Sequence, residues 1–581
     1  MSDLYFAGFE SRTPNPSIPL TPKRERIWHF LAAFSLGLGG WYCYWRWTET
    51  LNPDALFFSI AVAMSETLAL IGCALFYHDI WRQNDTPKAP APQTRQEAGL
   101  TRHGPIHVDI LITTLDETSD ILELSIQDAL NVSAPKGVVS KVYILDDGSR
   151  ENIKQLAARY DVGYISRPIS AGFKAGNLRH ALLRTSGDFF VICDADTRLF
   201  KGFLQNTLGY FRAPKTAWVQ TPHWFYDIPE PQQHRHVSRT WVERTFAKIL
   251  SPEKAHDPFM CDPGLFFDVI QRRRHRNNAS FCCGAASIHR KEAVLSVALK
   301  NYGAKILTSQ ANQSDTPHTR IAMAATDLQP FKYHVSEDIF TSIMIQSDPD
   351  SDWQSVYHPD VESRMLSPWG MKAWTTQRFK YAGGSLDICF RERVLLNKHL
   401  PWRTKLHYLA TFWSYLSCLW LLILLMAPVL TLLTGKAPIS APLMDFVLHL
   451  GPFLLINELA LVVGCWGHDI NKGRQLAIAG LPLTLKALWA VIKGQKIKFK
   501  ATPKTPFFPD FLASVRPHIV LMSITLFALV FAVVSFLIGA NSLSLSFLII
   551  NFFWAMWNIY ALSGAPRAAL WRSPISNTGN E

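Results

Sequence analysis

Paired carboxylates behind an apolar run are the first feature of this sequence that could do chemistry. Asp194 and Asp196 stand two residues apart, directly after the β-rich run at residues 189–193. Carboxylates at this spacing could both reach one hard divalent cation, and Mg²⁺ or Mn²⁺ prefers such oxygen ligands. An Asp pair at a turn is about as often a cap or an Asx-turn. The motifs around the pair decide between the two interpretations.

Two other apolar runs also end in acids or hydroxyls. Thr113 and Glu117 follow the run that begins at residue 108, and Asp146 and Asp147 follow residues 142–145. Parallel strands deliver the groups at their carboxyl ends to one edge of a sheet. Random surface charge would rarely give three such strand ends, so the sequence predicts one shared crevice.

A basic side chain lies between these acidic segments. Lys174 and Asn177 follow Gly172, which gives the backbone freedom to approach a phosphate or a base. Taken alone, this stretch would be read as an ordinary loop. Beside three acidic strand ends it is a candidate for the nucleotide side of the crevice.

A second acidic pair stands at the head of a predicted helix over residues 339–345. Glu337 and Asp338 follow Ser336, which fits an N-cap with acids in the first turn. The same position suits a general base, since a carboxylate within hydrogen-bond reach of a sugar hydroxyl could take its proton. The two interpretations are compatible, and Asp338 is the candidate base.

The elements that must position these groups alternate between strand and helix patterns. This alternation over residues 105–400 predicts an α/β layer fold. The apolar composition, 48% hydrophobic residues with 36 Phe and 19 Trp in 581 residues, adds a membrane region to that soluble unit.

Six apolar stretches are long enough to cross a bilayer. They cover residues 27–47, 55–77, 406–433, 444–465, 518–538 and 543–562. Residues 476–492, interrupted by Lys486, suit a helix lying in the interface. Glu66 lies inside the second stretch, where an acid is a functional-site hypothesis by default, although a hydrogen bond facing the bundle is its commoner fate.

The distribution of Lys and Arg predicts which loops lie in the cytosol. The net charge of +12 could indicate nucleic acid, but in a membrane protein Lys and Arg gather in cytoplasmic loops beside anionic lipid, so we predict membrane lipid and no nucleic acid as a partner. Both termini and the loop from 468 to about 516 are then cytosolic. The basic run at residues 272–276 is interpreted as a solvated or lipid-facing patch. Nine Cys without regular spacing give neither a zinc site nor a disulfide framework.

The predicted organisation is therefore as follows. It consists of a disordered or surface-lying cytosolic lead (1–26), two spans (27–80), a linker (81–104), a catalytic domain (105–400), two spans (401–467), an interface helix with a loop (468–514), two spans (515–563) and a cytosolic tail (564–581).

Taken together, the motifs resemble those of the processive, membrane-integrated family 2 glycosyltransferases, and most closely those of bacterial cellulose synthase catalytic subunits. The matching sequences, in the family's order, are DDG at 146–148, KAGN at 174–177, DAD at 194–196, VQTPHWF at 219–225, FCCG at 281–284, SED at 336–338, QRFKY at 377–381 and FKATPK at 499–504. They span residues from about 110 to 505, which is most of the chain.

The resemblance implies a GT-A fold at a bacterial inner membrane and an inverting transfer from a UDP-sugar to the end of a growing β-glucan. It implies that the donor contacts Thr113, Glu117, Asp146, Asp147, Lys174, Asn177, Asp194, Asp196, Gln377, Arg378, Lys380, Phe499, Thr502 and Lys504, with the metal on Asp194 and Asp196. It further implies that Glu337 and Asp338 are catalytic and that His223, Trp224, Phe281, Cys283 and Tyr381 contact the acceptor.

Two residues depart from the family's pattern. Its closing motif normally ends in Arg-Trp, and here it ends in Lys380 and Tyr381. Lys cannot make the bidentate fork that Arg makes to phosphate, and Tyr is smaller than the indole on which the terminal sugar should stack. A β-1,3 product of the curdlan type therefore stands beside the β-1,4 product.

Other activities stay open as well. The polymer could be built from UDP-GlcNAc or GDP-mannose, or the α/β domain could be an inactive part of a transport or scaffold protein. The family's accessory partners are periplasmic export subunits, and this chain leaves no room after its last span for the PilZ domain of many cellulose synthases.

Overall fold

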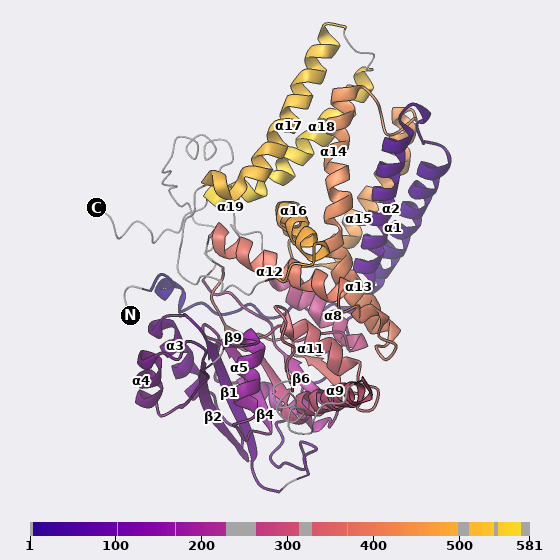
Figure 1. The fold of residues 1–581 in the computed structure, drawn as a ribbon. Helices are drawn as coiled ribbons and strands as arrows, with labels where there is room; N and C mark the ends of the chain where they lie inside the picture. The colour runs from indigo at the N-terminus through magenta and orange to yellow at the C-terminus, as the bar shows by residue number, and fades with distance from the viewer. Residues whose placement is uncertain are drawn as a thin grey trace, which may run out of the picture.

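The computed structural model describes residues 4–101, 103–168, 170–227, 263–312, 328–368, 370–497, 511–539 and 544–570. An α/β domain lies at one end and a bundle of long helices at the other, with α12 (Met371–Phe390) between them (Figure 1). The predicted α/β fold combined with a helical membrane region is thus confirmed. The predicted site residues Phe499, Thr502 and Lys504 lie outside the described residues.

The α/β domain is built on a mixed sheet of seven strands in the order β3-β2-β1-β4-β7-β6-β8. Neighbouring strands are parallel except at β7, which is antiparallel to both β4 and β6. The strands are β1 (Ile106–Thr114), β2 (Val138–Asp146), β3 (Gly163–Ser166), β4 (Phe189–Asp194), β6 (Thr216–Gln220), β7 (Ser287–Arg290) and β8 (Gln354–Tyr357). A two-stranded sheet of β5 (Arg198–Leu199) and β9 (Ser363–Arg364) lies beside it.

Helices cover both faces of the sheet, which is why its inner strands are apolar on both sides. One buried cluster joins the sheet to α3 (Ser119–Leu130), α4 (Glu151–Arg159) and α6 (Phe203–Thr207). The other joins it to α5 (Phe173–Leu182), α9 (Lys291–Asn312) and α11 (Glu337–Gln346). The domain is therefore a three-layer sandwich.

The strand register brings the predicted strand ends together. Thr113 pairs with Leu145 on one side and with Asp194 on the other, and Thr114 pairs with Asp146. The chain proceeds from β1 outward to β2 and β3, then returns to β4 on the opposite side of β1. Open α/β sheets bind ligands at such a reversal of strand order. The register confirms that the carboxyl ends of β2, β1 and β4 lie side by side at one edge of the sheet.

Five of the described helical segments are long and apolar enough to cross a membrane. They are Pro53–Asp79, Leu443–Gly464, Gly473–Ile492, Phe511–Leu537 and Leu545–Leu570. A sixth is formed if α13 (Trp402–Leu416) and α14 (Cys418–Thr434) are one span, which bends by 40° at Ser417.

This set differs from the predicted spans at two helices. The first helix, α1 (Pro22–Thr48), is not in it; its apolar run is diluted by Trp, Tyr and Gly, and it packs along α15 (Leu443–Gly464) and α2 (Leu56–Asp79). By contrast, α16 (Ile470–Ile492) is apolar enough to span. Figure 1 shows α16 nearly along its axis, across the direction of α1, α2 and α14, as expected for an interface helix. Its placement at the interface stays a prediction.

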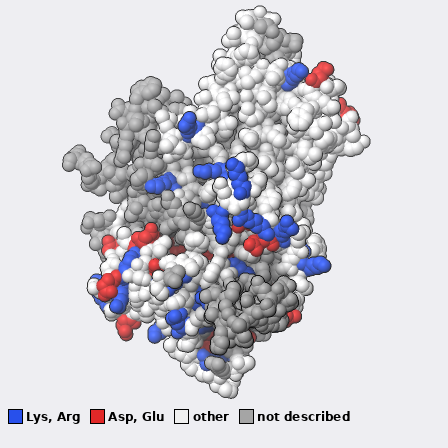
Figure 2. All heavy atoms as spheres, viewed as in Figure 1, with Lys and Arg blue, Asp and Glu red and all other residues white. Residues whose placement is uncertain are grey.

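Charge separates the two parts of the molecule. On the face in Figure 2, Lys and Arg gather across the waist, over α16, α12 and α13, while the helices above are almost uncharged. A band of basic residues beside an apolar helical bundle is typical of a membrane protein.

The N-terminal lead is not disordered over residues 4–12. The side chain of Phe6 is 2% exposed and packs against Ile121, Tyr226 and Leu366 of the α/β domain. The disordered alternative predicted for this lead is therefore wrong. The prediction followed the polar and Pro-rich composition of the lead, but the lead also contains two aromatic residues, Tyr5 and Phe6, that pack on the α/β domain.

The prediction of a solvated or lipid-facing patch for the basic run at residues 272–276 is also wrong. Arg272, Arg273 and Arg274 are only 3–4% exposed, because they insert at the end of α2. Arg272 pairs with Asp85, Arg274 pairs with Asp79, and Arg273 donates to the carbonyl of Ile80.

Arg276 completes this contact by donating to the carbonyls of Asp79 and His78. Carbonyls at a helix C-terminus carry partial negative charge, so guanidinium groups are suitable caps. We call Arg272, Arg273, Arg274 and Arg276 the arginine clamp, since they fasten the α/β domain to α2.

Candidate functional site

Lys174 is the centre of the candidate site. Its Nζ donates to Oδ1 of Asp194 and, at 2.6 Å, to the carbonyl oxygen of Gly284. Burial alone would lower the pKa of Lys174, but Asp194, Glu337 and Asp338 together hold that pKa above its usual value. Lys174, Asp194, Glu337 and Asp338, which we call the acidic site, thus converge from α5, β4 and α11.

The two acids of α11 have shifted titrations. Burial, with the neighbouring Asp338 carboxylate, raises the pKa of Glu337 to about 8. Burial also raises the pKa of Asp338, although its Oδ1 accepts the Ile339 amide at 2.9 Å. Adjacent buried carboxylates do not both ionise readily, and a hydrogen bond from an amide favours the ionised form. Glu337, with its pKa of about 8, is therefore protonated at neutral pH, and Asp338 stays the candidate base.

Gly284 allows the close convergence. Its φ of 84° is a conformation that L side chains rarely adopt. A Cβ at this position would lie 3.4 Å from Oδ2 of Asp338 and 3.7 Å from Nζ of Lys174. The backbone of Gly284 therefore forms the floor between the base and the lysine.

The donor chemistry of Asp194 and Asp196 fits a hard divalent cation. Asp194 ends β4 and Asp196 lies on the turn that follows, and the side chain of Asp194 is 48% exposed. Asp196 is buried, and its Oδ2 accepts the amide of Leu366 at 3.0 Å. Oxygen ligands from one rigid turn suit Mg²⁺ or Mn²⁺.

The four predicted residues at the ends of β1 and β2 take part in hydrogen bonds within the protein. Glu117 accepts from the hydroxyl of Thr114 and the amide of Leu115. Asp146 accepts from the amides of Gly148 and Arg150 and from Tyr164. Asp147 pairs through both oxygens with Arg167, and the Thr113 hydroxyl donates to the carbonyl of Cys193.

Two arginines that sequence reasoning missed organise these loops. Arg150 joins Asp146, the carbonyl of Glu117 and the hydroxyl of Thr114. Arg167 joins Asp147 to the backbone before α5. The only sequence signal for Arg150 is its position four residues after Asp146.

Asn177 serves β2 from the opposite side. Its Nδ2 donates to the carbonyl of Leu145 at 2.9 Å, whereas its Oδ1 is buried and has no hydrogen-bond partner among the described residues. Asn177 therefore fixes α5, and with it Lys174, against the end of β2.

Three of the predicted acceptor residues lie together. Phe281 packs with Ile339, Phe340 and Tyr408. The amide of Cys283 donates to Oε1 of Gln220 at 2.7 Å, and His223 contacts the carbonyl of Ala285 at 2.9 Å. Burial lowers the pKa of His223, which keeps its imidazole neutral. These residues form one wall next to the floor at Gly284.

Trp224 points elsewhere. Its ring packs with Phe200 and Tyr226, in the cluster that also contains Phe6. The structure therefore does not bring Trp224 together with Phe281 and Cys283.

Helix α12 carries Gln377, Arg378, Lys380 and Tyr381. The side chain of Tyr381 is 45% exposed, and the guanidinium of Arg378 lies 6.0 Å from its ring centroid. The helix is fastened to the segment before α11, because His334 pairs with Asp387 at 3.0 Å.

The same helix approaches the acidic pair closely. A Cβ on Gly384 would meet the Ser336 hydroxyl at 2.0 Å, so only glycine permits this contact. At its other face, Gly383 lies against Ile497, the last described residue before the predicted loop at 499–504. Helix α12 therefore links the acidic pair to the start of that loop.

Another trio of metal-ligand side chains lies outside this crevice. Ligand atoms of His78, Asp79 and His407 fall within 4.8 Å of one another. Asp79 already binds His407 and Arg274, and Nε2 of His407 contacts Asn277. The trio is part of the contact between α2 and the arginine clamp rather than a metal centre.

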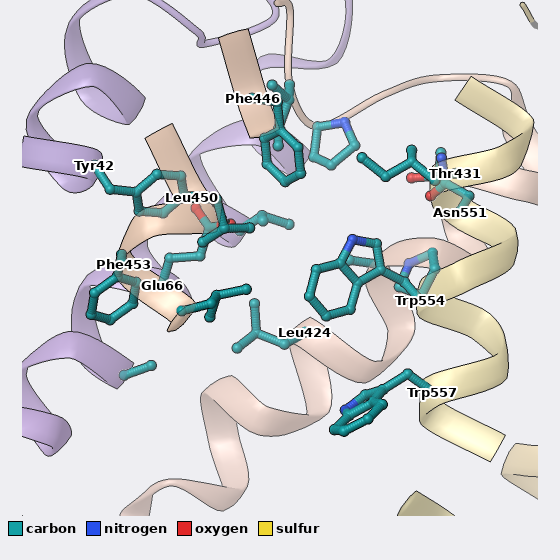
Figure 3. Close-up of a pocket in the computed structure, with 18 of the residues that line it drawn as sticks. Tyr42, Glu66, Leu424, Thr431, Phe446, Leu450, Phe453, Asn551, Trp554 and Trp557 are labelled. Carbon is teal, nitrogen blue, oxygen red and sulfur yellow. Dashed lines mark hydrogen bonds between the residues drawn. The ribbon is translucent and has the colours of Figure 1, made fainter. Parts of the chain in front are cut away.

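A cavity of about 880 Å³ lies within the helical bundle. Figure 3 shows Tyr42 and Glu66 on one side of it and the indole rings of Trp554 and Trp557 on the other. Glu66 accepts from the Tyr42 hydroxyl at 2.9 Å and pairs with Arg46 at 2.8 Å. Glu66 is therefore hydrogen-bonded within the helical bundle, which is the commoner of the two alternatives given for an intramembrane acid.

Comparison with known proteins shows which families and proteins this chain is similar to. The family model described as Glycosyl transferase family 2 matches residues 109–295. The chain is also similar to cellulose synthase 2 of Novacetimonas hansenii, with 27% identity over 512 residues that cover 86% of this chain and 28% of that protein.

A second relative is the cellulose synthase catalytic subunit (UDP-forming) of Pseudomonas fluorescens strain SBW25. It is 27% identical over 544 residues, which cover 91% of this chain and 64% of the relative. The chain therefore spans less than two thirds of the length of either relative.

A solved structure with similarity to this chain is a mannosyltransferase from Pyrobaculum calidifontis in complex with GDP-Man and Mn²⁺. The TM-score is 0.43 at 14% identity, over 75% of this chain and all of that one.

Proposed function

We propose that this membrane protein, whose residues 109–295 match the family 2 glycosyltransferase model, is a processive, inverting glycosyltransferase that polymerises glucose from UDP-glucose into a β-glucan. The observation that carries the proposal is the acidic site, where a lysine, a metal-ligand carboxylate and a candidate base share one crevice. The similarity to cellulose synthases over most of the chain supports glucose as the sugar.

The donor occupies the crevice at the carboxyl ends of β2, β1 and β4 in this proposal. Thr113 and Asp146 are placed at the uridine, with Asp147, Glu117 and Asn177 supporting the loops around it. Gln377, Arg378 and Lys380 of α12 approach from the side of the membrane.

Asp194 and Asp196 would hold Mg²⁺ or Mn²⁺, and the ion supplies electrostatic stabilisation of the diphosphate when it is bound. Lys174 contributes positive charge at the same place, where a leaving UDP gathers negative charge in the transition state. We assign Phe499, Thr502 and Lys504 to the diphosphate as well, on the resemblance of their motif.

Transfer with inversion requires one base and no protein nucleophile. Asp338 takes the proton from the acceptor hydroxyl, whose oxygen forms the new bond to the anomeric carbon of glucose. The bond from that carbon to UDP breaks at the same time, and its electron pair leaves with UDP. Glu337 holds a proton beside the base and limits the negative charge of the pair.

The acceptor end lies against Phe281, Cys283 and His223, with Tyr381 as an exposed aromatic face on α12. Aromatic rings pack well on the apolar faces of sugars. Trp224 is not part of this acceptor wall, because its ring packs with Phe200 and Tyr226 instead.

Translocation of the polymer through the helical bundle is the second part of the proposal. The cavity in Figure 3 supports it, because Trp554, Trp557 and Phe446 offer apolar ring faces and Asn551 offers hydrogen bonds. We place the protein in a bacterial inner membrane, with six spans, α16 at the interface, and the catalytic domain and both termini in the cytosol. We also propose the domain boundaries that the sequence predicts.

Linkage analysis tests the proposal. The purified full chain in lipid vesicles receives UDP-glucose with Mg²⁺, and the product is permethylated and analysed. A β-1,4 product means that Lys380 and Tyr381 are tolerated in a cellulose synthase site. A β-1,3 product, which those two residues favour as the alternative, means a reoriented acceptor.

Absence of any polymer from UDP-glucose would refute the glucose assignment. UDP-GlcNAc and GDP-mannose are then tested in the same vesicles. A chain that binds UDP with Mg²⁺ but turns over none of the three donors is an inactive transport or scaffold protein.

A further inference from the structure

The short segment at residues 363–367 connects the proposed metal site to its surroundings. Its first two residues form β9 and pair with β5, which follows the turn that carries Asp196. Next, the amide of Leu366 donates to Oδ2 of Asp196 at 3.0 Å. The following residue, Ser367, donates its amide and its hydroxyl to Asp227, at 2.9 and 3.1 Å. Adjacent residues thus hold Asp196 and Asp227.

The N-terminal segment reaches this point from outside the domain. The hydroxyl of Tyr5 donates to Oδ2 of Asp227 at 3.1 Å. Phe6 is buried against the side chain of Leu366, the residue whose amide holds Asp196. Tyr5 therefore binds the carboxylate that Ser367 holds, and Phe6 packs with Leu366.

Charged groups anchor the segment farther along. Glu10 pairs with Arg198 at 2.6 Å and with Arg364 at 2.9 Å, which are the paired residues of β5 and β9. Arg12 donates to the carbonyl of Tyr226 at 2.7 Å. Figure 1 shows the segment beside α3, on the side of the domain away from α13.

We infer that residues 4–12 complete the catalytic unit and that Tyr5 is a positioning residue for Asp196, acting through Asp227 and the Leu366-Ser367 backbone. The inference rests on the proposed function, since it concerns the carboxylate that would hold the diphosphate's cation. Residues that orient the ligands of a metal from outside affect its affinity by about 10- to 100-fold when they are replaced.

The test is calorimetric binding of UDP to the purified full chain, once with Mn²⁺ and once with EDTA. We expect Tyr5→Phe to weaken UDP binding about tenfold with Mn²⁺, the lower end of that range, because Tyr5 reaches Asp196 only through Asp227, Ser367 and Leu366. Binding with EDTA should be unchanged. A merely structural role would weaken both measurements together.

Two variants control the experiment. Ser17→Ala removes a hydrogen bond between the same lead and Asp360, away from Leu366, and should bind UDP like the wild type in both buffers. Glu10→Gln loosens the segment without touching Asp227, and should reproduce the Mn²⁺-dependent loss at a smaller factor if Tyr5→Phe does not fold.

The outcomes separate the inference from the function on which it rests. If the wild type binds no UDP with Mn²⁺, the proposed function fails, and the inference fails with it. If the wild type binds and the Tyr5 and Glu10 variants bind equally well, or lose affinity equally with and without Mn²⁺, the inference alone is overturned.

Discussion

Two groups of buried charge in this protein differ in how they are neutralised. In the acidic site, Lys174 faces Asp194, Glu337 and Asp338, so carboxylates outnumber the cation. In the arginine clamp, four guanidinium groups meet Asp79, Asp85 and backbone carbonyls at the end of α2.

The pKa shifts in the acidic site and in the arginine clamp have different causes. Excess negative charge and burial raise the pKa of Glu337 to about 8, so the acidic site is short of positive charge. Burial lowers the pKa of Arg273 and of Arg276 to about 10, yet both stay charged at neutral pH because carbonyls solvate them. A cation bound at Asp194 would offset the excess negative charge of the acidic site. The guanidinium groups of the arginine clamp already have their partners within the protein. The two groups therefore differ because backbone carbonyls complete the partners of the guanidinium groups, whereas the acidic site keeps an excess of carboxylates.

Loss of the base should have the largest effect and would show whether the imbalance serves chemistry. We expect Asp338→Asn to lower the rate of UDP release by roughly 10²- to 10⁴-fold, the range for a general base. The measurement is UDP release in vesicles with UDP-glucose and Mg²⁺. Asp350→Asn, which changes an exposed surface pair with Lys300, is the control and should keep wild-type activity. Full activity of Asp338→Asn would remove it from the mechanism.

Breaking the clamp should act on stability instead. Arg274→Ala leaves Asp79 buried without its guanidinium, which costs about 3–5 kcal/mol of folding free energy. The lowered unfolding temperature is followed by tryptophan fluorescence in detergent, and UDP affinity below that temperature should stay at the wild-type value. Arg159→Ala breaks an exposed pair with Glu123 and should cost less than about 1 kcal/mol. An unchanged unfolding temperature for Arg274→Ala would contradict a fastening role.

A change in backbone conformation should disturb the acidic site by a smaller amount. Gly284→Ala forces a side chain onto a residue with φ of 84°, at a strain of about 1–3 kcal/mol. Relaxation moves the carbonyl that binds Lys174, so kcat should fall by roughly 10- to 100-fold. Gly303→Ala, at a glycine with no atom within 4 Å of the added Cβ, is the matched control. Equal kcat for both variants would show that the floor is not needed.

The smallest effect concerns pH dependence. Because the pKa of Asp338 is raised, acid should inactivate the enzyme, and kcat/KM should rise with pH as Asp338 loses its proton. Glu337 has a pKa of about 8 and is protonated at neutral pH and below, so Glu337→Gln replaces one neutral side chain by another. The acidic limb of the pH profile should therefore stay at the wild-type position. A limb that moves to lower pH would mean that Glu337 is ionised beside Asp338.

The strand ends could be predicted from the sequence, whereas their partners could not. Thr113, Asp146 and Asp194 follow apolar runs, and the geometry of parallel strands then brings them together. Arg150 and Arg167 stand in no such pattern, since an arginine's acceptors depend on which loops fold back over it.

The two corrections have one physical cause. A run of basic residues suggests a solvent-exposed surface when the sequence shows no acceptors for it nearby. The acceptors of Arg274 and Arg276 lie about 195 residues away along the chain. Tyr5 and Phe6 are likewise over 200 residues from Asp227 and Tyr226. Tertiary contacts at such separations leave no local period in the sequence.

The arginine clamp also makes the bilayer part of the catalytic geometry. Arg274 binds Asp79 at the end of α2 and lies 5.9 Å from the ring centroid of Phe281, in the acceptor wall. A helix adjusts to a thinner or thicker hydrocarbon layer by tilting. Tilting of α2 would therefore displace Phe281, so under the proposed function lipid chain length would be a variable of elongation rather than a neutral choice of host membrane.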